Sequence, residues 1–143
     1  SIIHSMVEYK DASIIAQIGS PDMRLPIQYA LNYPKREGRI ANPISFYEIA
    51  QLTFEKPDMD TFKCLKLAFK AGKTGGLMPT ILNGANEEAV ALLLEEKIKF
   101  LDIADLIEEC MDKFKEKSNM ELTIDNIITV DKEVREYLRK KVS

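Results

Sequence analysis

The chain has 143 residues, of which 45% are hydrophobic and 30% charged, and its formal net charge at pH 7 is −3. These values are typical of a soluble globular protein with one sizeable core or two small ones, and the scattered basic residues argue against a nucleic-acid partner. No apolar run approaches the roughly 18 residues of a membrane span, and no basic segment followed by an apolar one indicates a signal peptide.

The first 18 residues predict a β-hairpin that is partly apolar on both faces. Two runs rich in Ile, Val, Met and Tyr flank the polar stretch "KDAS" at residues 10–13. A sheet that is apolar on both sides needs a cover on both sides, and an isolated hairpin is marginal in water. We therefore expect its other strands to come from sequence outside this chain or from a partner chain. Without an initial methionine, the start resembles a cut within a longer protein.

A helix and a long connection are predicted next. Asp22 is expected to cap a helix that tolerates Pro26 in its first turn, and Pro34 is expected to end it. Residues 35–60 mix polar residues, two prolines and short apolar segments. This composition predicts an extended connection and the main domain boundary.

From residue 60 onward the apolar spacing predicts helices almost throughout. One helix spans 61–71 and stops at "GKTGG"; a second spans about 79–97. A third begins with Asp102 as its cap, and after Thr123 a short turn leads into a last helix capped by Asp131. The apolar face of the third helix comprises Ile103, Leu106, Ile107, Cys110, Met111 and Phe114. The fold class is α+β: a partial sheet (hairpin) with a helix, an extended linker, and a C-terminal α-helical bundle.

The residues alone point to little chemistry. His4 is the sole histidine, and its spacing suits a hydrogen-bonded structural residue better than a catalyst. Cys64 and Cys110 lack neighbouring metal ligands and are predicted to be buried thiols in a reducing compartment. Neighbouring acidic residues are interpreted as solvated helix faces rather than metal clamps: Glu87 and Glu88, Glu95 and Glu96, Glu108 and Glu109.

Several long blocks carry a resemblance to a known family. "SIIHSMVEY", "AQIGSPDMRLPI", "LTFEKPD", "CLKLAFKA" and "LNGANEEAVALLLEEKIKFLDI" follow one another in the order of the C-terminal portion of the 1-deoxy-D-xylulose 5-phosphate reductoisomerase family. The resemblance implies that residues 1–34 end a central catalytic and dimerisation domain, 35–60 form the linker, and 61–143 form the C-terminal helical domain. A nucleotide-binding domain would precede them in the parent enzyme.

The resemblance also implies a function for the parent. Such an enzyme converts 1-deoxy-D-xylulose 5-phosphate, a phosphosugar, to 2-C-methyl-D-erythritol 4-phosphate in non-mevalonate isoprenoid biosynthesis, with NADPH and Mg²⁺ or Mn²⁺. It would be a homodimer joined through its sheet, located in a bacterial cytoplasm or a plastid-type organelle, without nucleic-acid or membrane partners. The fragment alone is expected to bind neither cofactor and to be inactive. A self-standing dimerisation or interaction module without catalysis remains the alternative.

Three residues match family positions at the active site. His4 matches a histidine that supports a catalytic group, and Met23, with Pro21 in the same loop, matches a methionine facing the nicotinamide and substrate. No metal ligand is expected in this fragment. Ala12 stands where many members have Gly, which predicts a hairpin turn without positive φ. Gly84 stands where Ala is common, which predicts a helix weaker by roughly 1 kcal/mol.

Overall fold

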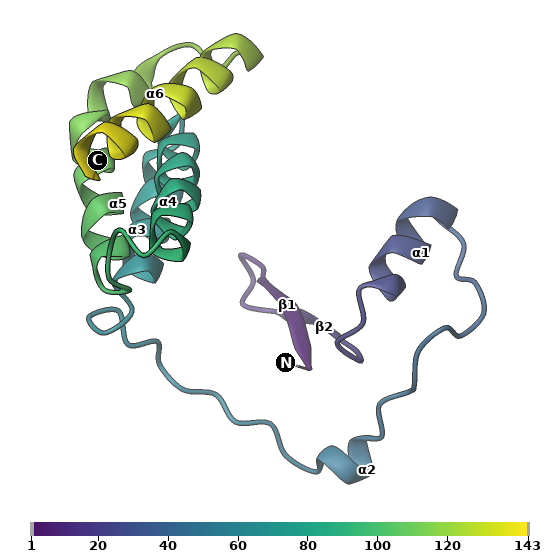
Figure 1. Ribbon diagram of the computed structural model, residues 1–143. Coiled ribbons are helices and arrows are strands. Elements are labelled where there is room, and N and C mark those ends of the chain that lie inside the picture. The colour runs from purple at the N-terminus through teal and green to yellow at the C-terminus, as the bar shows by residue number, and fades with distance from the viewer. Residues whose placement is uncertain (1, 143) are drawn as a thin grey trace. The chain divides into compact units, whose positions relative to one another are not determined.

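The computed structural model describes residues 2–142, and the chain divides into two compact units, Ser1–Glu55 and Lys56–Ser143 (Figure 1). The first unit holds a two-stranded sheet and two helices, and the second is entirely helical in its regular structure. The predicted α+β class, mostly helical, is confirmed. Among the helices within residues 2–142, none is both long and apolar enough to cross a bilayer.

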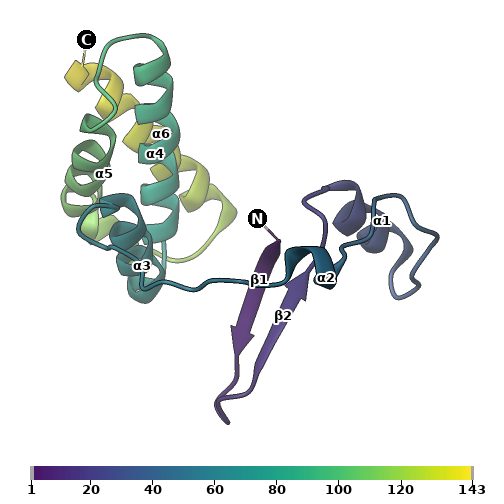
Figure 2. The ribbon, with the colours of Figure 1, turned by 90° about the horizontal axis from the view of Figure 1, so that it is seen from below.

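The predicted hairpin is present. Strands β1 (Ile3–Glu8) and β2 (Ile14–Ile18) pair antiparallel, with Met6 opposite Ala16 and Val7 opposite Ile15, and they lie side by side in Figure 2. The register is irregular between Ile3 and Ser5. None of residues 2–55 is fully buried, so both faces of the hairpin carry exposed apolar side chains. This exposure agrees with the expectation that further cover comes from elsewhere.

The turn of the hairpin differs from the prediction. Ala12 has a φ of +67°, in the left-handed region, whereas its side chain had suggested a turn without positive φ. The Ala12 N–H donates to the carbonyl of Tyr9 (3.0 Å), and the Tyr9 N–H donates to that of Ser13 (2.9 Å). Residues 10–12 thus form a three-residue loop, whose last residue is left-handed because this geometry brings the strands back together.

Helix α1 (Arg24–Asn32) follows the sheet and ends just before Pro34, as predicted. The N-cap position is occupied by Met23 and not by Asp22, the predicted cap. Asp22 lies one residue before the N-cap, and its carboxylate accepts a hydrogen bond from the Arg24 N–H (2.9 Å). The connection predicted to be extended contains a short helix, α2 (Phe46–Ile49). Its N-cap Ser45 accepts from the Glu48 N–H, and four residues are too few for a helical period to be visible in the sequence.

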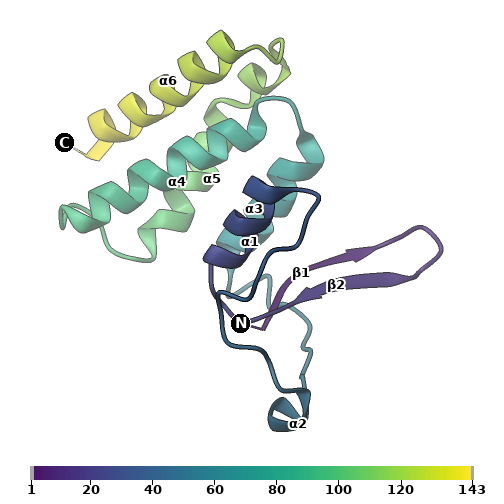
Figure 3. The ribbon, with the colours of Figure 1, turned by 90° about the vertical axis from the view of Figure 1, so that its right-hand side faces the viewer.

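The second unit is built around one central helix. Its elements are α3 (Lys63–Thr74), α4 (Met78–Leu94), α5 (Asp102–Lys113), the 3-10 helix η1 (Lys115–Asn119) and α6 (Ile124–Val142). Helix α4 contacts α3, α5 and α6, and Figure 3 shows α4 and α6 running side by side. The core consists of Leu67, Ala71, Leu77, Met78, Ile81, Ala85, Ala89, Leu92, Ile103, Leu106, Ile107, Cys110, Met111, Phe114, Val130, Val134 and Leu138.

The predicted apolar face of α5 is confirmed in full, since all six of its members are buried. The "GKTGG" stop is also confirmed: α3 ends at Thr74, and Gly75 and Gly76 have φ values of +70° and +55°. Asp102 is the first residue of α5 rather than its cap, and its carboxylate accepts from the Lys99 N–H (2.8 Å). The predicted cap of the following helix was likewise wrong, because Asp131 lies inside α6.

Two predictions about burial were also wrong. Cys110 is buried, and burial raises the pKa of its thiol to about 12, but Cys64 is exposed. Glu88, expected on a solvated face, is only 7% exposed and lies 2.5 Å from the guanidinium Nε of Arg139. The partner on α6 explains why this carboxylate can be buried, because a buried charge needs a counter-charge.

Candidate functional site

The loop between β2 and α1 is the centre of the candidate site. The Gly19 N–H donates to the carbonyl of Ile2 (3.1 Å), which ties the start of the loop to the residue just before β1. Its end is held by α1, because the carbonyls of Asp22 and Met23 accept from the N–H groups of the first helical turn (3.2 and 3.3 Å). Backbone hydrogen bonds therefore anchor both ends of the loop.

An ion pair closes this loop around Met23. The Asp22 carboxylate accepts from Arg24 Nε (3.0 and 3.1 Å) and from Arg24 Nη2 (2.6 Å). These hydrogen bonds, with the bond from the Arg24 N–H, lower the pKa of Asp22 to about 2 and raise that of Arg24. The pair is therefore fully charged at neutral pH.

All three residues predicted for the site lie at the open end of the hairpin. His4 is exposed on β1, and its ring lies against Gly19: a Cβ built on that glycine would be 3.9 Å from His4 Cε1. Pro21 and Met23 belong to the loop that Gly19 begins, and Met23 is 72% exposed. The structure thus brings His4 next to the start of the loop that carries the other two, while their roles stay predictions.

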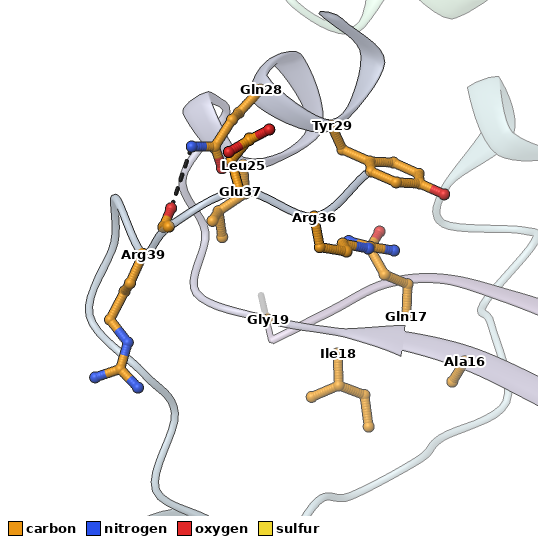
Figure 4. A pocket seen from close by; sticks show the side chains of 11 residues that line it. Ala16, Gln17, Ile18, Gly19, Leu25, Gln28, Tyr29, Arg36, Glu37 and Arg39 are labelled. Atoms are coloured by element: carbon orange, nitrogen blue, oxygen red, sulfur yellow. Dashed lines mark hydrogen bonds between the residues drawn. The ribbon is translucent and has the colours of Figure 1, made fainter. Parts of the chain in front are cut away.

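A hollow of about 430 Å³ lies between the hairpin, α1 and residues 36–39 (Figure 4). The Arg36 guanidinium lies 3.8 Å above the centre of the Tyr29 ring, and Gln28 Nε2 donates to the Gly38 carbonyl (3.1 Å). These two contacts hold the segment after α1 against the helix. A second hollow of about 370 Å³ includes Arg24 and Arg39 in its lining.

Sequence reasoning did not single out these lining residues. The signal available was "PKREGR", a short basic segment directly after a helix, but a basic segment in a connection is usually just solvated. That Arg36 turns back onto Tyr29 depends on the path of the connection, which spacing does not reveal.

The described part of the chain offers no metal centre: within residues 2–142, no group of three or more His, Cys, Asp or Glu side chains could hold a metal ion. The acidic neighbours of the helical unit instead pair with bases on other helices. Glu87 contacts Arg135, Glu95 contacts Arg139, and Glu108 contacts Lys63 on α3. These carboxylates join helices to one another.

The fold places the chain in the α+β class, with a hairpin and a helix that precede an α-helical domain. The family model described as the DXP reductoisomerase C-terminal domain matches residues 18–137. The chain belongs to this family, and the resemblance inferred from the sequence blocks is confirmed.

Curated relatives agree with this assignment. The chain is 71% identical over 140 residues to the 1-deoxy-D-xylulose 5-phosphate reductoisomerase of Clostridium beijerinckii, covering 98% of this chain and 36% of that protein. It is 67% identical over 138 residues to the enzyme of Clostridium botulinum strain Alaska E43, covering 96% and 36%. The chain therefore spans about a third of the length of these relatives.

Solved structures share the fold. A DOX-P reductoisomerase in complex with NADPH, fosmidomycin and magnesium matches with a TM-score of 0.88 at 40% identity, over 99% of this chain and 36% of that one. The 1-deoxy-D-xylulose 5-phosphate reductoisomerase of Zymomonas mobilis in complex with NADPH matches with a TM-score of 0.83 at 41% identity, over 99% and 37%.

Proposed function

We propose that this chain is the C-terminal part of an isomeroreductase that converts 1-deoxy-D-xylulose 5-phosphate to 2-C-methyl-D-erythritol 4-phosphate in isoprenoid biosynthesis. The observation that carries the proposal is the 71% identity over 140 residues to an enzyme of that name. The substrate skeleton is rearranged to an aldehyde, which takes a hydride from NADPH and a proton to become an alcohol. The bacterial relatives favour a cytoplasmic enzyme.

The contribution of this chain would come from the loop after β2. Met23 presents an exposed, flexible apolar side chain that can line the space for hydride transfer without holding water there. Pro21 shapes the same loop, and His4, next to Gly19, would orient a neighbouring catalytic group. When bound, NADPH supplies the hydride.

Mg²⁺ or Mn²⁺ does not fit the described residues, since residues 2–142 contain no suitable ligand cluster. We therefore assign no metal ligand to them and derive no step through the metal. In this proposal the ligands, the nucleotide-binding domain and most of the substrate site belong to the part of the relatives that this chain does not span. The chain alone should accordingly bind neither cofactor productively.

The domain assignment follows the same proposal. Residues 1–34 would complete the central catalytic domain, 35–60 would form the linker, and 61–143 would form the C-terminal helical domain. The hairpin would take part in a homodimer through its sheet. Support comes from large apolar side chains exposed on both strands, which a lone hairpin cannot cover: Met6, Val7, Ile14, Ile15 and Ile18.

A chimaera tests the proposed activity. In the C. beijerinckii enzyme, the matching 140 residues are replaced by this chain, and NADPH oxidation that depends on 1-deoxy-D-xylulose 5-phosphate is measured with Mg²⁺ or Mn²⁺. We expect activity close to that of the parent, and none from this chain alone or from the parent truncated before the match. A folded chimaera of native mass that oxidises no NADPH would contradict the proposal.

A non-catalytic dimerisation module is the second candidate, favoured by the same exposed apolar hairpin. Mass measurement under native conditions on this chain alone tests the module. A module predicts a dimer or aggregation through the unpaired strand edges. A chain that remains a soluble monomer would argue against the module.

A further inference from the structure

We infer that Asp22 and Arg24 are positioning residues for Met23: their ion pair joins the residues on either side of Met23 and holds the backbone from which its thioether projects. This inference rests on the proposed function, in which Met23 lines the space for hydride transfer. It assigns a role to two residues that do not themselves reach the reacting atoms.

The ion pair joins the two residues that flank Met23 in the sequence. Asp22 Oδ1 accepts from the N–H of Arg24 (2.9 Å), so the carboxylate spans the peptide units that flank Met23. The same carboxylate holds the Arg24 side chain through Nε and Nη2, with a shortest distance of 2.6 Å. A two-pronged pair of this kind fixes orientation as well as distance. Between the two paired residues, Met23 has a helical backbone conformation, with φ −63° and ψ −18°.

Among the described residues, the ion pair and a few backbone hydrogen bonds are the restraints on this conformation. Met23 is 72% exposed, and within residues 2–55 no side chain is fully buried that could hold the loop from below. The remaining local restraints are backbone hydrogen bonds, from Asp22 N–H to the Ser20 carbonyl (2.8 Å) and from Ile27 N–H to the Met23 carbonyl (3.3 Å). These hydrogen bonds hold the backbone before and after Met23, while the ion pair links Asp22 to Arg24 across it.

Stability does not account for the pair. The Arg24 side chain is 69% exposed, and ion pairs exposed to this degree contribute little to folding. Its Asp22 partner is 20% exposed and therefore sits inside the loop it organises.

The test uses the active chimaera and compares D22A and R24A with the unmodified protein. We expect kcat to fall about tenfold in each, since small misplacements near a reacting centre are costly, and the deuterium isotope effect with labelled NADPH to rise, while KM for the phosphosugar changes less. The double variant should be no worse than either single one, because both remove the same interaction. Arg24→Lys keeps the charge without the planar fork and should recover only part of the activity.

A matched control and an independent signal accompany these variants. Lys70→Ala removes an exposed ion pair of α3 with Asp112 (3.2 Å) and should leave kcat unchanged. In protein labelled with ¹³C at the methionine methyls, the Met23 resonance should shift in D22A and R24A and not in K70A, whether or not the chimaera turns over. An unmoved resonance, or a kcat within twofold of normal, would overturn the inference. An inactive but folded chimaera would instead contradict the proposed function.

Discussion

Gly84 lies where α4 packs on α6, and the reason for a glycine there is spatial. A Cβ at this position would be 2.8 Å from Oδ1 of Asp131, which is too close without a shift of that side chain. The carboxylate is not free to move, because it accepts from Arg135 Nε at 2.7 Å. Gly84 lowers the helix propensity of α4, as the sequence indicated. In return it leaves room for the ion-paired side chain of Asp131 against that helix.

The effect of alanine at Gly84 should therefore depend on Asp131. Gly84→Ala alone should destabilise the protein by about 1 kcal/mol, because crowding outweighs the gain in helix propensity. In an Asp131→Ala background the same change should stabilise by about 1 kcal/mol, since only propensity remains. Urea unfolding measures both. Gly72→Ala on α3, where a new methyl group would meet nothing within 4 Å, is the control and should stabilise; equal effects of Gly84→Ala in both backgrounds would contradict the crowding.

Ala12 makes the opposite case, because it occupies a position that suits glycine. Its φ of +67° costs an L-residue roughly 1 kcal/mol, and Ala12→Gly should remove most of that cost. Amide hydrogen exchange should show slower exchange at Tyr9, whose N–H closes the hairpin loop. Ala16→Gly in β2, where φ is not positive, should do the reverse. Faster exchange at Tyr9 in Ala12→Gly would contradict the strain.

At the scale of single residues, the sequence predicted which residues form the apolar face of a regular helix. It missed residues whose burial or backbone conformation depends on the surrounding loop or on a residue of another helix. The α5 face follows from its period alone, so every member was found. The left-handed Ala12 and the buried Glu88 depend on loop geometry and on Arg139. The same holds for the candidate site: the resemblance predicted His4 and Met23, but no sequence pattern predicts that Asp22 and Arg24 form an ion pair.

Helix α6 is attached to its neighbours by charge as well as by its apolar face. Arg135 pairs with Glu87 (2.5 Å), Arg139 with Glu95 (2.6 Å), and Lys141 with Glu109 (2.6 Å). The buried face formed by Val130, Val134 and Leu138 begins before Asp131 and continues beyond it. Asp131 pairs with Arg135, four residues later on the same helix. Because the buried face is also continuous, α6 runs through the position where a new helix was predicted to begin.

These pairs predict a pH dependence of stability. Hydrogen bonds from Arg135, Arg139 and Lys141 lower the pKa values of Glu87, Glu95 and Glu109, respectively, below their ordinary value of 4.5. The stabilisation is therefore fully present above that value and is lost as the pH falls through the lowered values. The urea midpoint should decrease on acidification below about pH 4.5.

The control is the triple variant E87Q/E95Q/E109Q, which should have a lower midpoint at pH 7 and a weaker dependence on acid. High salt should narrow the difference between the two proteins at neutral pH, because these pairs are partly exposed. The same acid dependence in both proteins would show that other carboxylates are responsible.

Across the whole molecule, burial is distributed very unequally between the two units. Every fully buried side chain among residues 2–142 belongs to the unit Lys56–Ser143, whereas the unit Ser1–Glu55 has none. The sequence anticipated this contrast, because helical periods imply a closed bundle while a hairpin apolar on both faces implies missing cover. It could not place the short α2 within the connection.

This contrast predicts that the two units differ in whether they fold alone. Residues 56–143 should unfold cooperatively in urea, because α4 buries one face of α3, α5 and α6 at once. Ile81→Ala, at a fully buried position of α4, should cost about 2–5 kcal/mol. Residues 1–55 should show no cooperative transition and fast amide exchange, since a lone hairpin and helix without a core cannot offset the entropy of ordering them. A sharp transition in residues 1–55 would mean that the hairpin needs no cover, and would remove the main support for its role in a dimer.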